Sequence, residues 1–381
     1  MQKHFLIFYL NTGAGHKSAA TALRQAILER HPSAKVTLAL GYDVRQFWYH
    51  LIFEKGYHFS STVVPPIFSM VIKIFRHRWV QSLAAKVVGI PLSRYIRRVI
   101  RDNQVTDVIS VHFFVTPSCV RALRRLKQVN PQIDISFRCI VTDPFAPEAA
   151  WFYSKNVQYN VFSERARNMA IQRFGIPEKN ISVMPFILNK KYSNPPTPQR
   201  ITELREKYGF APGRRILLLA GGGEGLPHAT AVVNACLQRK NDFALIVVCG
   251  RAKVMEKSLK LIAASNPSLD LHVFGFVDFM EELIAICDCA VIKAGPATLM
   301  EVLRYRKPVI ICSYIKHEMA NIRFARYHKV GWLIRKPARI IEQVEKLFSD
   351  NQYYEKIREN LAKIQIDTDL APYVDKLMEE N

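Results

Sequence analysis

Residues 5–16 read Phe-Leu-Ile-Phe-Tyr-Leu-Asn-Thr-Gly-Ala-Gly-His, and this stretch decides the fold class. Its continuous apolar part, residues 5–10, has the pattern of a strand that is buried on both faces. From Ser18 to Leu28 the apolar residues recur at helical spacing, so a helix follows the glycine-containing turn. Glycine lets such a turn approach a ligand closely, and the helix N-terminus offers free N–H groups and a positive dipole end. The stretch therefore predicts an α/β strand–turn–helix unit with a turn that faces a ligand.

His16 stands at the end of this turn. A histidine in such a place is a candidate general base, because its unperturbed pKa lies near working pH. The alternative is an ordinary strand–turn–helix joint with an incidental histidine, since glycine turns are common in α/β folds. The turn alone does not decide between the two.

The same alternation of apolar runs and helical stretches continues along the whole chain, which predicts parallel sheets covered by helices on both faces. Strands are expected at 4–10, 35–40, 107–112, 135–142 and 157–162, and again at 215–220, 244–249, 271–274, 289–293 and 308–312. The proline-containing segment 186–199 is the best linker candidate. We therefore expect an α/β protein of two doubly wound, Rossmann-like domains, 1–190 and 191–381, facing each other across a cleft. The final helical stretch, about 351–380, caps the second domain or crosses back to the first.

The charge of the chain is strongly positive and uneven. The 381 residues carry a net charge of +22. Residues 1–190 hold 26 Lys and Arg against 10 Asp and Glu, whereas 191–381 hold 28 against 22. Such a field favours a polyanion or an anionic membrane surface. No recognised nucleic-acid-binding module appears, so we expect the membrane surface and no nucleic acid.

The cysteines and the apolar runs indicate which cellular compartment to expect for the protein. The 7 cysteines are scattered, and no Cys/His cluster has the spacing of a metal site, so buried free thiols in a reducing compartment and no metal are expected. The N-terminus lacks the layout of a signal peptide, and no run of about 20 apolar residues predicts a spanning helix. The prediction is a cytoplasmic protein that touches a membrane.

Segment 60–101 is the candidate for that membrane contact. Apolar and aromatic residues alternate with basic ones there, as interfacial amphipathic segments require. The residues expected to enter the interface are Ile67, Phe68, Phe75, Arg76 and Trp79. The alternative is a helix that packs on the core and presents a solvated basic face.

Three clusters in the second half follow strand-like runs. Gly221 and Gly222 follow the strand 215–220, and Lys293 with Gly295, Pro296, Ala297 and Thr298 follows the strand 289–293. Glu318 and Asn321 come after the strand 308–312. Open α/β sheets bind ligands outside the carboxyl ends of their strands, where helix N-termini bind phosphate and a carboxylate accepts ribose hydroxyls. Taken alone, Glu318 is more typical of a surface residue, but together the three clusters predict a nucleotide site. Neither a nicotinamide-type Gly-x-Gly-x-x-Gly pattern nor a Walker loop is present.

Over nearly its whole length the sequence resembles the two-domain GT-B glycosyltransferases that glycosylate diacylglycerol, namely the plant monogalactosyldiacylglycerol synthases and the bacterial processive diacylglycerol glucosyltransferases. The motifs that carry the resemblance are 13–16 with Leu23, Thr142-Asp143 with the downstream Trp151, 247–251, 275–277 and 288–311. Together these motifs are specific, although no single one is.

The resemblance implies a UDP-sugar donor held by the second domain and no metal or other cofactor. Gly250, Arg251, Phe276 and Val277 would line the uracil side, 295–298 would meet the diphosphate, Glu318 would hold the ribose, and Asn321 would lie near the sugar. His16 would take the proton of the acceptor hydroxyl, and Asp143 would orient His16 or contact the acceptor. Gly15 and Trp151 would face the acceptor or the membrane.

The function predicted from these residues is an inverting hexosyltransferase. It would move a hexose from a UDP-sugar to diacylglycerol, or to a glycosyl-diacylglycerol, as a peripheral, monotopic enzyme on the cytoplasmic face of a membrane. Three alternatives stay open: the N-acetylglucosaminyltransferase of peptidoglycan lipid-intermediate synthesis, a UDP-sugar epimerase, and a catalytically inactive lipid- or nucleotide-binding protein.

Overall fold

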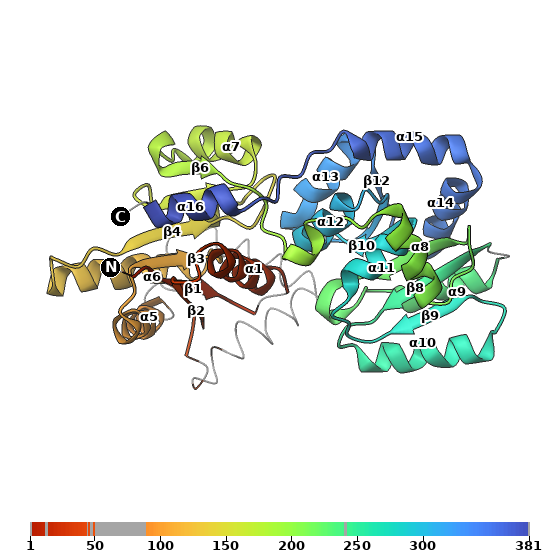
Figure 1. Ribbon diagram of the computed structural model, residues 1–381, viewed down its shortest axis with the longest axis horizontal. Helices are drawn as coiled ribbons and strands as arrows, with labels where there is room; N and C mark the ends of the chain where they lie inside the picture. The colour runs from red at the N-terminus through yellow and green to blue at the C-terminus, as the bar shows by residue number, and fades with distance from the viewer. Residues whose placement is uncertain are drawn as a thin grey trace. The chain divides into compact units, whose positions relative to one another are not determined.

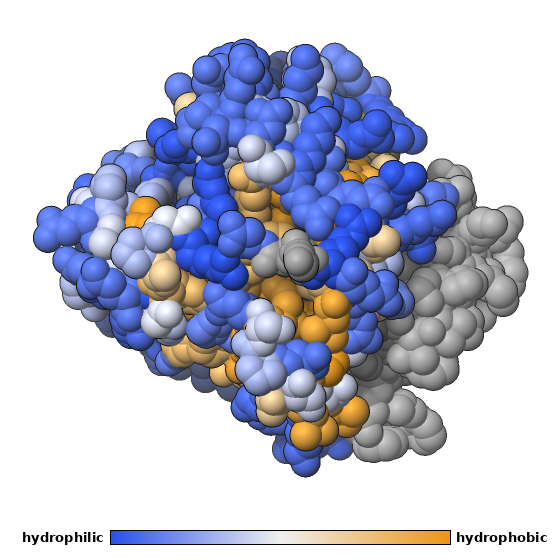
Figure 2. Space-filling model, turned by 90° about the vertical axis from the view of Figure 1, so that its right-hand side faces the viewer, coloured by the Kyte–Doolittle hydropathy of each residue, from blue (hydrophilic) through white to orange (hydrophobic). Residues whose placement is uncertain are grey.

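The computed structural model describes residues 2–11, 14–43, 45, 49, 89–239 and 242–379. The protein is an α/β protein with two six-stranded parallel sheets, as the sequence predicts (Figure 1). It divides into two compact units, which we call unit 1 (Met1–Asn189 and Asp367–Asn381) and unit 2 (Lys190–Ile366). Charged and polar side chains cover most of the face shown in Figure 2, and hydrophobic residues gather around its centre and lower part.

The sheet of unit 1 has the strand order β2-β1-β3-β4-β5-β6. Its strands are β1 (His4–Tyr9), β2 (Lys35–Leu40), β3 (Asp107–Ser110), β4 (Ser136–Ile140), β5 (Gln158–Val161) and β6 (Ile181–Val183). The chain runs from β1 to one edge at β2 and then returns to build the other side from β3 onward. The strand order therefore reverses between β1 and β3, which is where open sheets of this kind hold their ligands.

Helices cover both faces of this sheet because a strand such as β1 is apolar on both sides. In β1, Phe5 and Ile7 pack in one core cluster with α1 (Ala14–Arg30) and α16 (Ala371–Glu379). Their neighbours Leu6 and Phe8 pack in another with α5 (Gly89–Asn103) and α6 (Thr116–Val129). A third cluster joins β4 and β5 to α7 (Glu164–Phe174), which Ser163 caps and the left-handed Gly175 ends. Short 3₁₀ turns occupy Ala149–Trp151 and Glu178–Asn180.

The helix α16 belongs to unit 1 although it follows unit 2 in the sequence, and Figure 1 shows it in blue among the elements of unit 1. Val374 and Leu377 are fully buried in the cluster that contains α1. Tyr373 donates a hydrogen bond of 3.0 Å to Asn160 Oδ1 on β5, and Arg30 pairs with Asp375 at 2.8 Å. The predicted final helical stretch is therefore two helices, of which α15 (Asn351–Ala362) lies in unit 2.

The sheet of unit 2 has the strand order β12-β11-β10-β7-β8-β9. Its strands are β7 (Arg215–Ala220), β8 (Phe243–Val248), β9 (Leu271–Phe274), β10 (Cys289–Lys293), β11 (Val309–Ser313) and β12 (Gly331–Leu333). Its other helices are α8 (Pro198–Lys207), α9 (Ala229–Leu237), α10 (Lys253–Ser265), α11 (Met280–Ile286), α12 (Pro296–Arg304), α13 (Met319–Tyr327) and α14 (Pro337–Ser349), with 3₁₀ turns at Lys190–Tyr192, Gly222–Glu224 and Lys316–Glu318. Here the strand order reverses between β7 and β10.

All ten strands expected from the sequence are present, and two short ones were not expected. These are β6 and β12, which have three residues each. The predicted linker 186–199 begins inside unit 1, since Phe186, Ile187 and Leu188 are buried, and its last residues start α8. Proline content alone therefore overestimated the length of the connection.

The predicted membrane segment is described only in its last part. Ile67, Phe68, Phe75, Arg76 and Trp79 lie outside the described residues. Within 89–101, α5 buries Leu92, Ile96 and Ile100, so this part is a helix packed on the core with a basic outer face. None of the described helices is long and apolar enough to cross a membrane.

All seven cysteines are buried and free. Their burial raises the pKa of each thiol, for example that of Cys287 to about 12, so they remain protonated at neutral pH. The prediction of buried free thiols is confirmed.

Candidate functional site

The predicted residues of the first half meet where the strand order of unit 1 reverses. His16 lies in the first turn of α1, which follows β1, and Val111 directly follows β3. Thr142 and Asp143 follow the next strand, β4. The carboxyl ends of adjacent parallel strands share one edge of a sheet, so segments far apart in sequence come together there.

The imidazole of His16 is held by one of its two ring nitrogens. Its Nδ1 lies 2.9 Å from the carbonyl oxygen of Val111 and 3.1 Å from Thr142 Oγ1. A carbonyl oxygen can only accept a hydrogen bond, so Nδ1 carries the hydrogen and donates it. In the neutral ring the lone pair is then on Nε2. His16 therefore stays a candidate base, and its accepting atom would be Nε2.

A second histidine, His112, lies beside His16, with the ring centroids 4.3 Å apart. Its side chain is buried, and its Nδ1 accepts a hydrogen bond of 3.2 Å from the backbone N–H of Phe114. Burial, and secondarily the nearby His16, hold the pKa of His112 well below its usual range. His112 therefore stays neutral at physiological pH. Sequence reasoning missed it, although its place at the end of the predicted strand 107–112 was a usable signal.

Asp143 and Trp151 form a pair in this region. The indole N–H of Trp151 donates a hydrogen bond of 2.7 Å to Asp143 Oδ2, and the indole is 1% exposed. The Trp151 ring lies 6.2 Å from the ring of His16. The indole is therefore buried against Asp143 and does not itself present a membrane contact. His16 Nδ1 contacts Val111 and Thr142, and the orienting role foreseen for Asp143 stays a prediction.

Gly15 occupies the second position of α1. Apart from its chain neighbours and its own helix backbone, the described residues place no atom within 4 Å of a Cβ built there. The described part of the protein thus sets no steric demand for glycine at this position.

In unit 2 the glycine turn after β7 meets the end of β10. A Cβ on Gly221 would lie 2.0 Å from the carbonyl oxygen of Gly225, so only glycine fits at Gly221. A Cβ on Gly222 would lie 4.0 Å from Lys293 Nζ, and one on Gly295 would lie 3.7 Å from Lys293 Cε. The ammonium of Lys293 is therefore close to the glycines of both turns, at the point where the strand order reverses.

The helix α12 begins in the same place. Gly295 is its N-cap and contributes no side-chain cap, and Pro296, Ala297 and Thr298 form its first turn. The first N–H groups of a helix have no partner within it, and the helix dipole adds positive potential there. Together with Lys293 these amides form a setting suited to a phosphate group.

Glu318 and Asn321 differ in how their side chains are used. Glu318 is buried, and its Oε2 accepts a hydrogen bond of 2.9 Å from the backbone N–H of Ile315, while Oε1 lies 3.8 Å from the position of a Cβ on Gly295. The expectation that Glu318 alone is a surface residue is wrong. Asn321 donates a hydrogen bond of 2.7 Å to the carbonyl oxygen of Ala294, so it ties α13 to the end of β10. A sugar contact by Asn321 stays a prediction.

The remaining predicted donor residues lie at the ends of β8 and β9. Gly250 has a φ of +57°, and a Cβ there would lie 2.4 Å from the carbonyl oxygen of Gly223. The backbone N–H of Arg251 donates to that same oxygen at 2.8 Å, and its guanidinium lies 5.4 Å from the ring centroid of Phe276. Phe276 is 62% exposed and Val277 is half-buried. An exposed ring beside a guanidinium offers a flat surface for a planar base.

Comparison with known proteins agrees with this geometry. Residues 16–185 match the family Monogalactosyldiacylglycerol (MGDG) synthase, and residues 216–371 match the Glycosyltransferase family 28 C-terminal domain. The chain is a distant homologue of the MGDG synthases within family 28. This confirms the resemblance on which the sequence predictions relied.

Two curated relatives illustrate this kinship. The chain is 26% identical over 360 residues to the chloroplastic monogalactosyldiacylglycerol synthase of Spinacia oleracea, covering 91% of this chain and 66% of that protein. It is 22% identical over 388 residues to the processive diacylglycerol beta-glucosyltransferase of Bacillus licheniformis, covering 100% and 95%. The chain thus spans just under two thirds of the length of the plant relative.

Solved structures support the fold. MurG of Acinetobacter baumannii aligns over 99% of this chain and 100% of its own with a TM-score of 0.64 at 15% identity. The UDP-GlcNAc 2-epimerase of Neisseria meningitidis, bound to UDP-GlcNAc, aligns over 100% of both chains with a TM-score of 0.63 at 14% identity. At such low identity these likenesses concern the fold alone.

Proposed function

We propose that the protein is an inverting glycosyltransferase that moves a hexose from a UDP-sugar to diacylglycerol or to a glycosyl-diacylglycerol. Support comes from the family matches, which cover both halves of the chain, and from relatives named for galactosyl and glucosyl transfer. The observation that carries the proposal is the orientation of His16, whose Nδ1–H is bound to the carbonyl of Val111.

In the proposed step His16 acts as the general base. Its Nε2 takes the proton of the acceptor hydroxyl while the hydroxyl oxygen forms a bond to C1 of the sugar. The bond from C1 to the UDP oxygen breaks, and its electron pair leaves with the diphosphate. Attack from the face opposite the leaving group inverts the configuration at C1.

The leaving diphosphate is assigned to the start of α12. The charge that develops on its oxygen needs nearby positive groups, and the amides of Ala297 and Thr298 with the ammonium of Lys293 supply them. These groups belong to the backbone and to a strand end, so they are already in place before the reaction.

The rest of the UDP-sugar is assigned to the neighbouring strand ends of unit 2. Gly250, Arg251, Phe276 and Val277 would surround the uracil, and Glu318 would accept the ribose hydroxyls through Oε1. Its burial and the hydrogen bond from the backbone N–H of Ile315 favour a fixed Glu318 carboxylate over a mobile surface one. Asn321 would contact the sugar only through the part of its amide that Ala294 does not use.

Membrane association is part of the proposal. A peripheral enzyme on the cytoplasmic face would meet diacylglycerol at an anionic surface, and α5 presents Arg94, Arg97 and Arg101 outside its buried stripe. The residues foreseen for the interface, Ile67, Phe68, Phe75, Arg76 and Trp79, belong to the undescribed segment and stay predictions.

The test is a transfer reaction on lipid vesicles. The protein and vesicles that contain diacylglycerol are incubated in three separate reactions, one each with UDP-glucose, UDP-galactose and UDP-N-acetylglucosamine. The lipids of each reaction are then analysed by mass spectrometry. A hexosyl-diacylglycerol that disappears in His16→Ala supports the proposal. Bound UDP without any glycolipid would indicate an inactive sensor, and conversion of the UDP-sugar without lipid would indicate an epimerase. Transfer of N-acetylglucosamine alone would favour the peptidoglycan-type alternative.

A further inference from the structure

The turn 112–115, between β3 and α6, brings a phenylalanine to the surface beside the candidate base. Phe114 is 43% exposed, whereas the next residue, Val115, is fully buried. The ring centroid of His112 lies 4.3 Å from that of His16 and 5.7 Å from that of Phe114. The rings of Phe114 and His16 are therefore separated by at most the sum of these two distances.

Hydrogen bonds and packing fix the shape of this turn. The backbone N–H of Phe114 donates to His112 Nδ1 at 3.2 Å, and the backbone N–H of Val115 donates to the carbonyl oxygen of His112 at 3.1 Å. The hydroxyl of Ser110 donates to the same carbonyl oxygen at 3.0 Å. Val115 also packs in the core cluster that β1 shares with α6. The fold therefore holds the residues around Phe114 in place and keeps its ring at the surface.

Phe114 is the exposed ring of an aromatic cluster. The ring centroid of Phe113 lies 4.4 Å from that of Phe114 and 5.5 Å from that of Trp151, which is buried. These rings support Phe114 from within, so its outer surface can cover another apolar group without a rearrangement of the turn. Single exposed apolar side chains are common on protein surfaces. It is the position of Phe114 beside the candidate base that gives its exposure a meaning.

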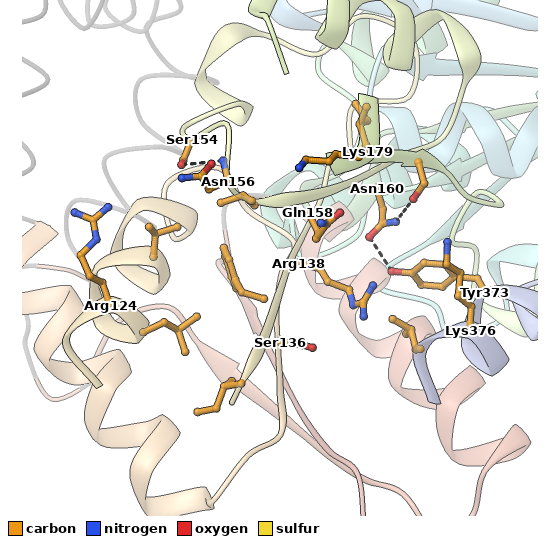
Figure 3. Close-up of a pocket in the computed structure, with 18 residues that line it drawn as sticks. Arg124, Ser136, Arg138, Ser154, Asn156, Gln158, Asn160, Lys179, Tyr373 and Lys376 are labelled. Carbon is orange, nitrogen blue, oxygen red and sulfur yellow. Dashed lines mark hydrogen bonds between the residues drawn. The ribbon is translucent and has the colours of Figure 1, made fainter. Parts of the chain in front are cut away.

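A cavity in unit 1 lies at the wrong edge of the sheet to hold the reacting end of an acceptor. Its volume is about 630 Å³, and the first residues of β4, β5 and β6 line it, namely Ser136, Gln158 and Ile181 (Figure 3). His16 and the turn 112–115 lie at the opposite, carboxyl edge. A hydroxyl that gives its proton to a base has to come within hydrogen-bond reach of it. The groups next to that hydroxyl therefore belong on the surface around the turn and not in this cavity.

We propose that the Phe114 ring contacts the ester and acyl-chain part of a diacylglycerol-type acceptor while the acceptor hydroxyl is at His16. The inference rests on the proposed function, which supplies the acceptor class, and it adds a specificity-determining residue to the site. In diacylglycerol the esters and the first acyl methylenes are only a few bonds from the free hydroxyl, so one molecule can reach both rings. Covering the apolar surface of Phe114 favours an acylated acceptor over an unacylated one.

The test measures binding of a short-chain diacylglycerol to the full chain, without UDP-sugar and without membranes. Isothermal titration calorimetry uses dihexanoylglycerol in solution, and glycerol is the unacylated control. Phe114→Ser should weaken the binding of dihexanoylglycerol about five- to thirtyfold, because a small polar side chain replaces the apolar contact. Phe114→Leu keeps an apolar side chain, so its affinity should stay within about threefold of wild type.

A matched control and a kinetic measurement separate a contact from a folding defect. Val129→Ser removes an apolar side chain that is 82% exposed at the far end of α6, and it should leave the binding unchanged. In a transfer assay with the same soluble acceptor, Phe114→Ser should raise KM for dihexanoylglycerol and keep kcat and the affinity for UDP. A merely structural role of Phe114 would lower kcat and the temperature of thermal unfolding as well.

The inference is overturned if the wild-type protein does not bind dihexanoylglycerol, or if Phe114→Ser binds it as tightly as Val129→Ser does. Equal weakening in both variants would overturn it too. Calorimetry involves no transfer step, so the two proposals can fail separately. A wild-type protein that binds dihexanoylglycerol through Phe114 but forms no glycolipid would support the contact and refute the proposed function.

Discussion

Replacing His16 by alanine tests the central assignment. The variant removes the ring whose Nδ1 is bound to Val111 O at 2.9 Å and whose Nε2 would take the proton in the proposed step. A positioned general base contributes about 10²- to 10⁴-fold to the rate, or about 2.7 to 5.5 kcal/mol of the activation barrier. The turnover of His16→Ala should fall by that factor. UDP binding should not change, because the residues assigned to UDP all lie in unit 2.

A graded variant sharpens this prediction. Thr142→Val removes the hydroxyl that lies 3.1 Å from His16 Nδ1 and keeps the carbonyl of Val111. One hydrogen bond contributes about 0.5 to 1.5 kcal/mol, so turnover should fall only about 2- to 12-fold. His31→Ala, a histidine just beyond α1 that contacts Asp375, serves as the matched control with unchanged turnover.

The assay measures turnover of glycolipid on vesicles and the affinity for UDP by calorimetry, with thermal unfolding as the check on folding. If His16→Ala retained more than about a tenth of the wild-type turnover, the assignment of the base would be wrong. A parallel loss of UDP affinity would instead indicate that the substitution disturbs the fold or the donor site.

Three further predictions concern the donor site, pH and stability. Gly250→Ala places a Cβ on a residue with left-handed backbone, 2.4 Å from the carbonyl oxygen of Gly223. Calorimetry should show UDP binding weakened more than about fivefold. In the control Gly223→Ala the nearest atom to the new Cβ would be 3.7 Å away, so UDP affinity should stay within about twofold of wild type. The pKa of His112 is held well below its usual range, so in mild acid the unfolded chain binds a proton at His112 that the folded chain does not bind. The free energy of unfolding should therefore decrease as pH falls below about 6.5, by up to about 1.4 kcal/mol per pH unit. Urea unfolding at pH 7.5 and 5.5 should show a smaller decrease for His112→Asn, and an equal decrease in both proteins would contradict the buried neutral ring. Val374→Ala, which truncates a fully buried side chain of α16, should lower the stability of unit 1 by about 2 kcal/mol, and thermal unfolding that is unchanged would refute the packing of α16.

The regular parts of the fold could be predicted because parallel strands buried on both faces leave long apolar runs. The apolar run 5–10 corresponds to β1, and the predicted strand 215–220 has the same bounds as β7. The strands β6 and β12 escaped prediction because three residues do not establish a pattern. Each is an edge strand of its sheet, where less apolar surface is covered.

The strand order could not be predicted from the sequence, and for that reason only part of the site could be predicted. Glycine turns and a helix start are local features, so Gly221, Gly295 and His16 were recognisable from the sequence. That Val111 and His112 reach His16 depends on β3 pairing with β1, which is a tertiary fact. Burial of Glu318 and Trp151 likewise depends on distant elements, and propensity scales score both residues by their average behaviour.

The return of α16 to unit 1 bears on the order in which the chain becomes structured during synthesis. The groove that Tyr373, Val374 and Leu377 fill is made by residues translated early, yet its occupant emerges only after every residue of unit 2. At about 5 to 20 residues per second, the ribosome leaves that apolar groove uncovered for roughly ten to thirty-five seconds. Unit 2 can complete its core within this interval. The part of the protein whose translation starts first is thus the last to complete its core.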